Sequence, residues 1–209
     1  CRRIMIDMDS ILYNIKRFIP NTLLQKVRPL YHLLLSYAGA VWYRHPSQYL
    51  TVVAVTGTKG KSTVTEMTAH LLRTHGFKVA SLSTIRFMID EEETPNLFKM
   101  TTPGRFFVQR FLRQAVDGGC THVVLEMTSE GAKQFRHRFI EFDALIFTNL
   151  SPEHIESHGS FENYKNAKLR IAGAVFRSKK RPRYLIANKD NAHGVAFLNF
   201  AVEHKIGYG

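Results

Sequence analysis

The sequence has 209 residues, the length of one ordinary domain with an appendage, and its 44% of hydrophobic residues excludes a chain too polar to build a core. Lys and Arg number 29 against 17 Asp and Glu, so the net charge of +12 favours an anionic partner: nucleotide, nucleic acid or membrane surface. Two cysteines, Cys1 and Cys120, lack a metal-binding spacing and favour a reduced, cytoplasmic location.

The first 48 residues are predicted to form a helical N-terminal segment, with Pro20 and Pro46 as breaks. Its most apolar window, residues 29–43, is shorter than the roughly 20 residues needed to span a bilayer. A helix packed on the following domain is the favoured interpretation, and an interfacial membrane helix or a signal anchor are the alternatives. A weak membrane-surface contact through residues 21–45 is therefore one expected interaction.

From Leu50 onward, strand-like and helix-like segments alternate, which predicts an α/β domain over residues 49–209 with a doubly wound, mostly parallel sheet. Polar residues gather just after the strands, where ligands bind in open α/β sheets. The predicted strands are 50–55, 78–84, 121–127, 143–149 and 183–188, and the predicted helices are 62–76, 103–119, 160–175 and 191–204.

A glycine-rich loop follows the first of these strands and precedes a helix. Glycines let backbone N–H groups approach phosphate oxygens, and the helix N-terminus adds positive potential. Lys61 can reach the β- and γ-phosphates of a nucleotide, and the Ser62 hydroxyl can join a Mg²⁺ shell. The usual phosphate-loop pattern has Gly at the position of Val55, and the alternative interpretation is an ordinary strand-to-helix turn. The predicted nucleotide-binding residues are Gly57, Thr58, Lys59, Gly60, Lys61, Ser62 and Thr63.

This short loop resembles the Gly-Thr-x-Gly-Lys-(Ser/Thr)-(Ser/Thr) loop of the Mur ligase family, ATP-dependent enzymes that join amino acids to peptidoglycan precursors. The resemblance covers about residues 50–191 and is strongest to the subfamily that adds the third residue of the stem peptide. In that subfamily a Thr-Thr pair like Thr101 and Thr102 contacts the muramoyl-peptide substrate. Alone, this pair would be interpreted as a helix cap.

The stretch after the third predicted strand resembles the family's Glu-x-Ser-Ser-x-Gly-x-x-Gln-x-Arg. An acidic residue at a strand end near a phosphate loop is a usual Mg²⁺ ligand, which is the role predicted for Glu126. The resemblance implies that Ser129, Gln134 and Arg136 bind substrate, and a guanidinium can clamp a carboxylate with two hydrogen bonds. Glu130 stands where His is common in that subfamily.

The most specific stretch, residues 148–168, resembles the family's Thr-Asn, Asp-His, His-Gly and Tyr-x-x-Ala-Lys series. The resemblance implies that His154 is a second Mg²⁺ ligand and that Lys168 is the lysine that the family carbamylates. Glu153 replaces the usual Asp. Catalytic roles are predicted for Lys61, His154 and Lys168, and metal ligation for Ser62, Glu126, His154 and the Lys168 carbamate.

The implied function is an ATP- and Mg²⁺-dependent ligase that activates the carboxylate of a UDP-muramoyl-peptide as an acyl phosphate, which an amino acid then attacks. A ligase adding glutamate to folate and a non-catalytic phosphate-loop module are the alternatives. No nucleic-acid-binding motif supports a nucleic-acid partner. The family's usual uridine-binding domain is not expected in residues 1–48, nor its C-terminal amino-acid domain within this chain.

Overall fold

A computed structural model of the chain describes residues 21–98, 100–101, 104–153 and 155–209. Its strands form one eight-stranded sheet in the order β4-β3-β2-β5-β1-β6-β7-β8. The strands are β1 (Thr51–Thr56), β2 (Val79–Leu82), β3 (Arg86–Ile89), β4 (Glu92–Pro95), β5 (His122–Glu126), β6 (Ala144–Phe147), β7 (Tyr184–Asn188) and β8 (His204–Tyr208). The helices are α2 (Asn21–Trp42), α3 (Lys61–Thr74), α4 (Arg105–Asp117), α5 (Ser129–Lys133), α6 (Ile155–His158), α7 (Phe161–Arg177), α8 (Gly194–Leu198) and the 3-10 turn η1 (Pro46–Tyr49).

Six of the eight strands run parallel, which confirms the predicted α/β class with a mostly parallel sheet. β1 pairs in parallel with β5 and β6, and the parallel pairing continues outward to β2 on one side and to β7 and β8 on the other. Strands β3 and β4 extend the β2 edge in antiparallel fashion. The central strand β1 is rich in β-branched residues, and Val52, Ala54 and Val55 are fully buried, as expected for a strand covered on both faces.

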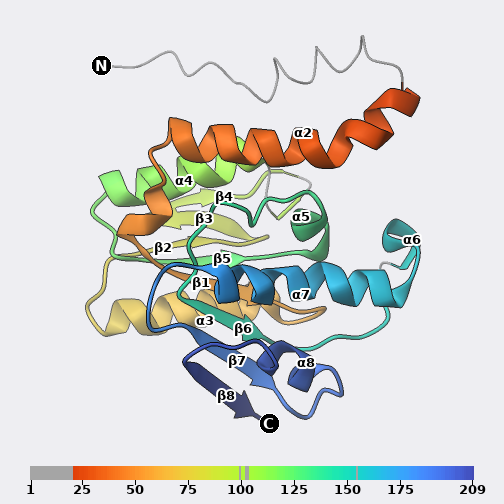
Figure 1. The fold of residues 1–209 in the computed structure, drawn as a ribbon. Coiled ribbons are helices and arrows are strands. Elements are labelled where there is room, and N and C mark those ends of the chain that lie inside the picture. Colours follow the sequence, from red (N-terminus) through yellow and green to blue (C-terminus); the bar gives the residue numbers. More distant parts are fainter. Residues whose placement is uncertain (1–20, 99, 102–103, 154) are drawn as a thin grey trace.

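Helices cover both faces of the sheet (Figure 1). The main apolar core lies between the sheet and the face formed by α4 and α7, with Leu112 and Ile171 among its fully buried members. A smaller cluster on the other face joins Ala69 of α3 to Val55 and Val124 of the central strands. Helix α2 lies outside α4, so it forms an extra layer on one side of the domain.

The predicted N-terminal helix is present over Asn21–Trp42, and residues 1–20 lie outside the described part of the chain. Hydrogen bonds and packing attach this helix to the domain: the Ser36 hydroxyl donates to the Phe135 carbonyl at 3.0 Å, and Gly39 lies against α4. Across the described residues, no helix combines the length and the apolar character that crossing a membrane demands.

The prediction of a helix over residues 191–204 is wrong in most of its length. Helix α8 is only five residues long, and His204 begins the edge strand β8, which the sequence analysis did not predict. All five β8 side chains are exposed, so the strand lacks an alternating pattern, and its backbone pairing with β7 supports it. The hairpin β3–β4 was also missed because each strand has only four residues and β4 is fully exposed. An Arg86–Glu66 ion pair of 2.6 Å helps to anchor it.

Candidate functional site

The candidate site lies at the carboxyl ends of β1, β5 and β6, where the strand order reverses. The chain leaves β1 first toward β2 and β5 on one side, and later continues through β6 on the other side. Such a switch point separates the two loops that follow its flanking strands and is where doubly wound sheets bind ligands. Here those loops are the glycine-rich loop after β1 and the Thr148–Asn149 segment after β6.

The glycine-rich loop is in close contact with the end of β6. A Cβ atom on Gly57 would lie 1.9 Å from the Thr148 hydroxyl oxygen, so this position accepts only glycine without rearrangement. The Thr58 N–H donates to the Asn149 carbonyl at 2.8 Å, and the Lys59 N–H donates to the Asn149 side-chain oxygen at 2.9 Å. These contacts hold the loop in one shape before any ligand arrives, which lowers the ordering cost of binding.

The loop ends at the N-terminus of α3. Gly60 takes a left-handed conformation with φ of 76° directly before the helix. Lys61 begins the helix, and its ammonium donates to the Thr58 carbonyl at 2.9 Å. The helix N-terminus and this cation therefore combine their positive potential beside the loop, as a phosphate-binding site requires.

Ser62 and Glu126 supply two adjacent oxygen ligands. The Ser62 hydroxyl donates to the Glu126 carboxylate at 2.8 Å, and that carboxylate is almost fully buried. Hard oxygen donors of this kind suit Mg²⁺, so the pair fits the predicted metal. The predicted ligand His154 lies outside the described residues, and the described residues contain no cluster of three His, Cys, Asp or Glu that could hold a metal.

Thr84, which the sequence analysis did not single out, orients the Glu126 carboxylate. Its backbone N–H donates to Glu126 at 2.8 Å, and its hydroxyl lies 3.1 Å from both carboxylate oxygens. The same hydroxyl lies 2.8 Å from the Thr101 hydroxyl, one of the two predicted substrate threonines. Thr102 lies outside the described residues. Thr84 follows the strand β2, so its position after a strand was the one signal that the sequence offered.

Lys168 of α7 reaches the glycine-rich loop from the face of the sheet opposite to α3. It is buried, and its ammonium donates to the Gly57 carbonyl at 2.5 Å and lies 4.8 Å from the centre of the Tyr164 ring. Burial, reinforced by the charge of Lys61, lowers the pKa of Lys168 to about 7, although Glu126 and Glu153 act in the opposite direction. Tyr164 was not predicted, and its hydroxyl lies 3.0 Å from that of Thr58.

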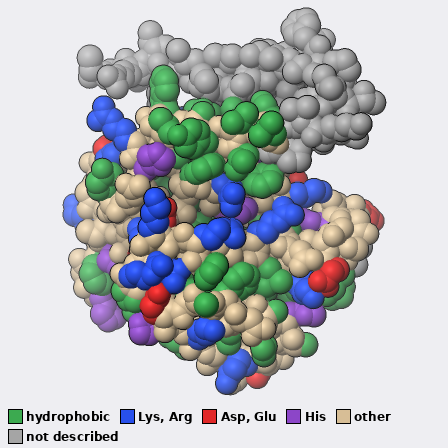
Figure 2. Space-filling view, viewed as in Figure 1, with side chains coloured by type: hydrophobic (Ala, Val, Ile, Leu, Met, Phe, Trp, Pro, Cys, Tyr) green, Lys and Arg blue, Asp and Glu red, His purple; other side chains and the backbone are tan. Residues whose placement is uncertain are grey.

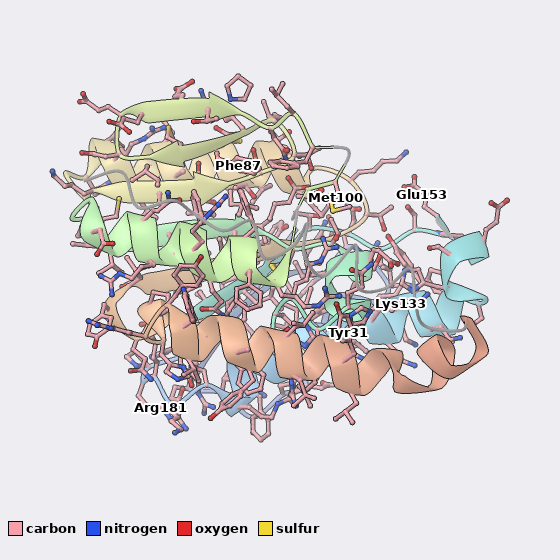
Figure 3. The ribbon with its side chains drawn as sticks, turned by 90° about the horizontal axis from the view of Figure 1, so that it is seen from above. Tyr31, Phe87, Met100, Lys133, Glu153 and Arg181 are labelled. Atoms are coloured by element: carbon pink, nitrogen blue, oxygen red, sulfur yellow. The ribbon has the colours of Figure 1, made fainter. Side chains whose placement is uncertain are left out.

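Of the predicted substrate residues after β5, two contact each other and the third contacts a histidine. Arg136 is buried and donates from Nη2 to the Gln134 side-chain oxygen at 2.8 Å, so these two predicted residues are brought together. The Ser129 hydroxyl lies 3.1 Å from Nε2 of His158, a residue that was not predicted. Figure 3 shows Met100, which Arg136 contacts, on the same side of the molecule as Lys133 and Glu153, and Arg181 on the other side. The substrate roles themselves stay predictions.

Comparison with known proteins identifies the family. A family model described as the Mur ligase middle domain matches residues 55–209. This chain belongs to the Mur ligase family. The match includes the glycine-rich loop, Glu126 and α7, which are the parts that build the candidate site.

Curated relatives and a solved structure agree with this family. UDP-N-acetylmuramyl-tripeptide synthetase 2 of Oceanobacillus iheyensis is 36% identical over 153 residues, 73% of this chain and 31% of that protein. A solved UDP-N-acetylmuramoyl-L-alanyl-D-glutamate–2,6-diaminopimelate ligase superimposes with a TM-score of 0.71 at 27% identity, covering 84% of this chain and 36% of that one. The chain thus spans about a quarter to a third of the curated relatives it matches.

A more distant structure shares the fold. Escherichia coli FolC, solved in complex with DHPP and ADP, superimposes with a TM-score of 0.63 at 18% identity, over 85% of this chain and 47% of FolC. At this identity the likeness shows a common fold and carries no conclusion about substrate.

Proposed function

We propose that this chain forms the nucleotide-binding, carboxylate-activating part of an ATP-dependent ligase that adds an amino acid to a UDP-muramoyl-peptide during peptidoglycan precursor synthesis. The observation that carries the proposal is the hydrogen bond of 2.8 Å between Glu126 and Ser62, the residue that follows Lys61 in the chain. It joins the phosphate loop to the neighbouring strand end through two oxygen donors. The names of the curated relatives support the substrate class, because they are synthetases and ligases of UDP-N-acetylmuramyl peptides.

The proposed reaction has two steps. A carboxylate oxygen of the muramoyl-peptide attacks the γ-phosphorus of ATP, and the bond from that phosphorus to the bridging oxygen breaks as ADP leaves. The amine of the amino acid then attacks the acyl carbon, the phosphate leaves with its oxygen, and the nitrogen loses a proton. Two anions meet in the first step, so the Lys61 ammonium and the N-terminal N–H groups of α3 would lower the barrier by stabilising the phosphoryl oxygens.

Mg²⁺ would be held by Ser62 and Glu126, where it would neutralise phosphate charge and keep the reacting groups in line. Arg136 and Gln134 would hold an anionic part of the muramoyl-peptide, since a guanidinium binds a carboxylate through two hydrogen bonds. Thr101, close to Thr84 and Glu126, would place the same substrate near the metal. His154 stays a predicted second ligand.

Lys168 is proposed to be carbamylated in the active enzyme. Its amine must lose a proton before it can take up CO₂, and its buried position favours the neutral form. The carbamate would be an anion with two oxygens, which suits Mg²⁺. It would replace the amine that now donates to the Gly57 carbonyl of the phosphate loop.

The proposal is tested by trapping the activated acid. Hydroxylamine intercepts acyl phosphates, so the protein incubated with ATP, Mg²⁺, hydroxylamine and UDP-muramoyl-dipeptide should produce a hydroxamate and ADP. Lys61→Ala should lower the yield at least about tenfold, because it removes a charge-assisted contact of about 1.5–3 kcal/mol. Lys205→Ala, on the exposed edge strand β8, is the matched control and should behave as the unchanged protein.

The same assay separates the alternatives. A hydroxamate formed with a folate acceptor and not with the muramoyl-peptide would favour the folylpolyglutamate-type ligase. Nucleotide binding with no hydroxamate from either acid would favour a non-catalytic nucleotide-binding module.

A further inference from the structure

A cavity lies away from the candidate nucleotide site. It has a volume of about 240 Å³ and lies between residues 137–141, which precede β6, and the C-terminal end of α7. Just beyond this helix end, the Lys180 ammonium contacts the Leu50 carbonyl at the amino end of β1. The phosphate loop follows the carboxyl end of the same strand, so the cavity lies toward the amino ends of the strands and the candidate nucleotide site at their carboxyl ends.

Arginines predominate among the charged side chains around this cavity. Arg138 and Arg177 line it, and Arg170 lies two helical turns before Arg177 on α7. Across the described residues, none of these three guanidinium groups forms an ion pair. Glu141 also lines the cavity, and its carboxylate accepts a hydrogen bond from the Lys179 N–H at 2.7 Å. Figure 2 shows Lys and Arg side chains gathered across the middle of this face of the molecule.

His137 gives independent evidence of a missing partner. Its side chain is 2% exposed and lines the cavity, and its Nδ1 atom has no hydrogen-bond partner in the described part of the chain. Burial and then the charges of Arg138, Arg177 and Arg170 lower its pKa to about 3. The charged groups that lower this pKa are all cations, and buried polar atoms are normally hydrogen-bonded.

We propose that the cavity formed by His137, Arg138 and Arg177 is a second anion-binding site that takes a phosphate group. A phosphate would place negative charge between two guanidinium groups that otherwise repel each other, and guanidinium binds phosphate through paired hydrogen bonds. The neutral His137 imidazole, protonated at Nδ1, supplies a further donor. Phe139 and Ala174 give the cavity apolar walls that suit an organic phosphate.

The phosphate has two possible sources, a soluble phosphate compound or a lipid headgroup. The second source is relevant because an apolar stripe on α2 lies beside the cavity. Leu30, Leu34, Tyr37 and Val41 recur at helical spacing, and each is 47–57% exposed. The Tyr37 ring centre lies 5.3 Å from that of Phe139, so the stripe and the cavity are adjacent.

The test uses the whole chain carrying Lys61→Ala, so that the phosphate loop does not dominate binding. Pyrophosphate is titrated while the imidazole signals of His137 are followed by NMR, and binding to vesicles of phosphatidylcholine with phosphatidylglycerol is measured by sedimentation. Arg138→Gln and Arg177→Gln should each lower the binding affinity for whichever probe responds, pyrophosphate or anionic vesicles, at least tenfold. Arg73→Gln, on α3 at the other face of the sheet, is the control and should bind normally.

A response to pyrophosphate that shifts the His137 signals and is lost in the two arginine variants identifies a site for soluble phosphates. A response to the anionic vesicles alone, lost in the same variants and missing with pure phosphatidylcholine, identifies a headgroup site. The proposal is overturned if neither probe binds, or if binding is unchanged in both variants while circular dichroism shows that they are folded.

Discussion

Thr84 connects the predicted metal ligand Glu126 with Thr101, a predicted substrate residue. Its hydroxyl contacts both the Glu126 carboxylate and the Thr101 hydroxyl, so one short side chain sets the orientation of two groups with different proposed roles. We expect Thr84→Val to raise the Mg²⁺ concentration needed for half-maximal nucleotide binding about tenfold, because a hydrogen bond to a charged group contributes about 1.5–3 kcal/mol. The Thr84 N–H would still hold Glu126, which limits the loss.

Thr84→Ser is the matched control for this prediction. It keeps the hydroxyl and removes one methyl group, so it should preserve the Mg²⁺ dependence within about twofold. Isothermal titration of a non-hydrolysable ATP analogue over a series of Mg²⁺ concentrations measures both variants. Equal Mg²⁺ dependence in Thr84→Val and the unchanged protein would show that Thr84 does not orient the metal ligand.

His137 should make the fold sensitive to acid. Its pKa is about 3 in the folded chain, below the usual value of about 6.5, so between these pH values the unfolded chain binds one proton more. Stability is therefore lost as the pH falls from about 6.5 toward 3, at up to about 1.4 kcal/mol for each pH unit. In His137→Phe this contribution disappears, and urea unfolding at pH 7, 6 and 5 should show a shallower decline. A parallel decline in the two proteins would contradict the assigned pKa.

At the scale of elements, segments with strong local patterns were predicted well and those held by pairing were not. Helix α7 combines helical apolar spacing with a Ser160 cap, and both ends of the helix lie within two residues of the predicted ends. Strand β8 has no buried side chain, and each of its residues pairs with a β7 residue 20 positions earlier, so nothing local marks it as a strand. The same limit applied within the site: Glu126 ends an apolar strand and was predicted, whereas its contact with Thr84 spans 42 residues.

The cap of α7 supports the helix that carries Lys168. The Ser160 hydroxyl accepts a hydrogen bond from the Asn163 N–H at 3.1 Å, which satisfies one of the free donors of the first turn. We expect Ser160→Ala to lower the free energy of unfolding by about 1 kcal/mol, and Ser160→Asp, which can also cap, to restore most of it. Urea denaturation followed by circular dichroism measures both. A stability loss of equal size in the two variants would show that the cap hydrogen bond is not the cause.

At the scale of the whole molecule, the candidate nucleotide site is made by three strand ends that are far apart in the sequence. The loop after β1 is held by Asn149 after β6, and Ser62 is held by Glu126 at the end of β5. A nucleotide bound here would contact groups that come together only in the folded sheet. Its binding free energy therefore adds to the stability of the fold, because the unfolded chain has no comparable site.

We therefore expect MgATP to raise the melting temperature of the whole domain. At a concentration 100 times the dissociation constant, the stabilisation is about 2.7 kcal/mol, which corresponds to roughly 5–11 °C for a domain of this size. Lys61→Ala, which weakens binding at least about tenfold, should lose about half of the shift or more at the same nucleotide concentration, whereas Lys205→Ala should keep it. Differential scanning calorimetry at several MgATP concentrations measures the effect. A shift of equal size in Lys61→Ala would mean that the nucleotide binds elsewhere, and the phosphate-loop assignment would be wrong.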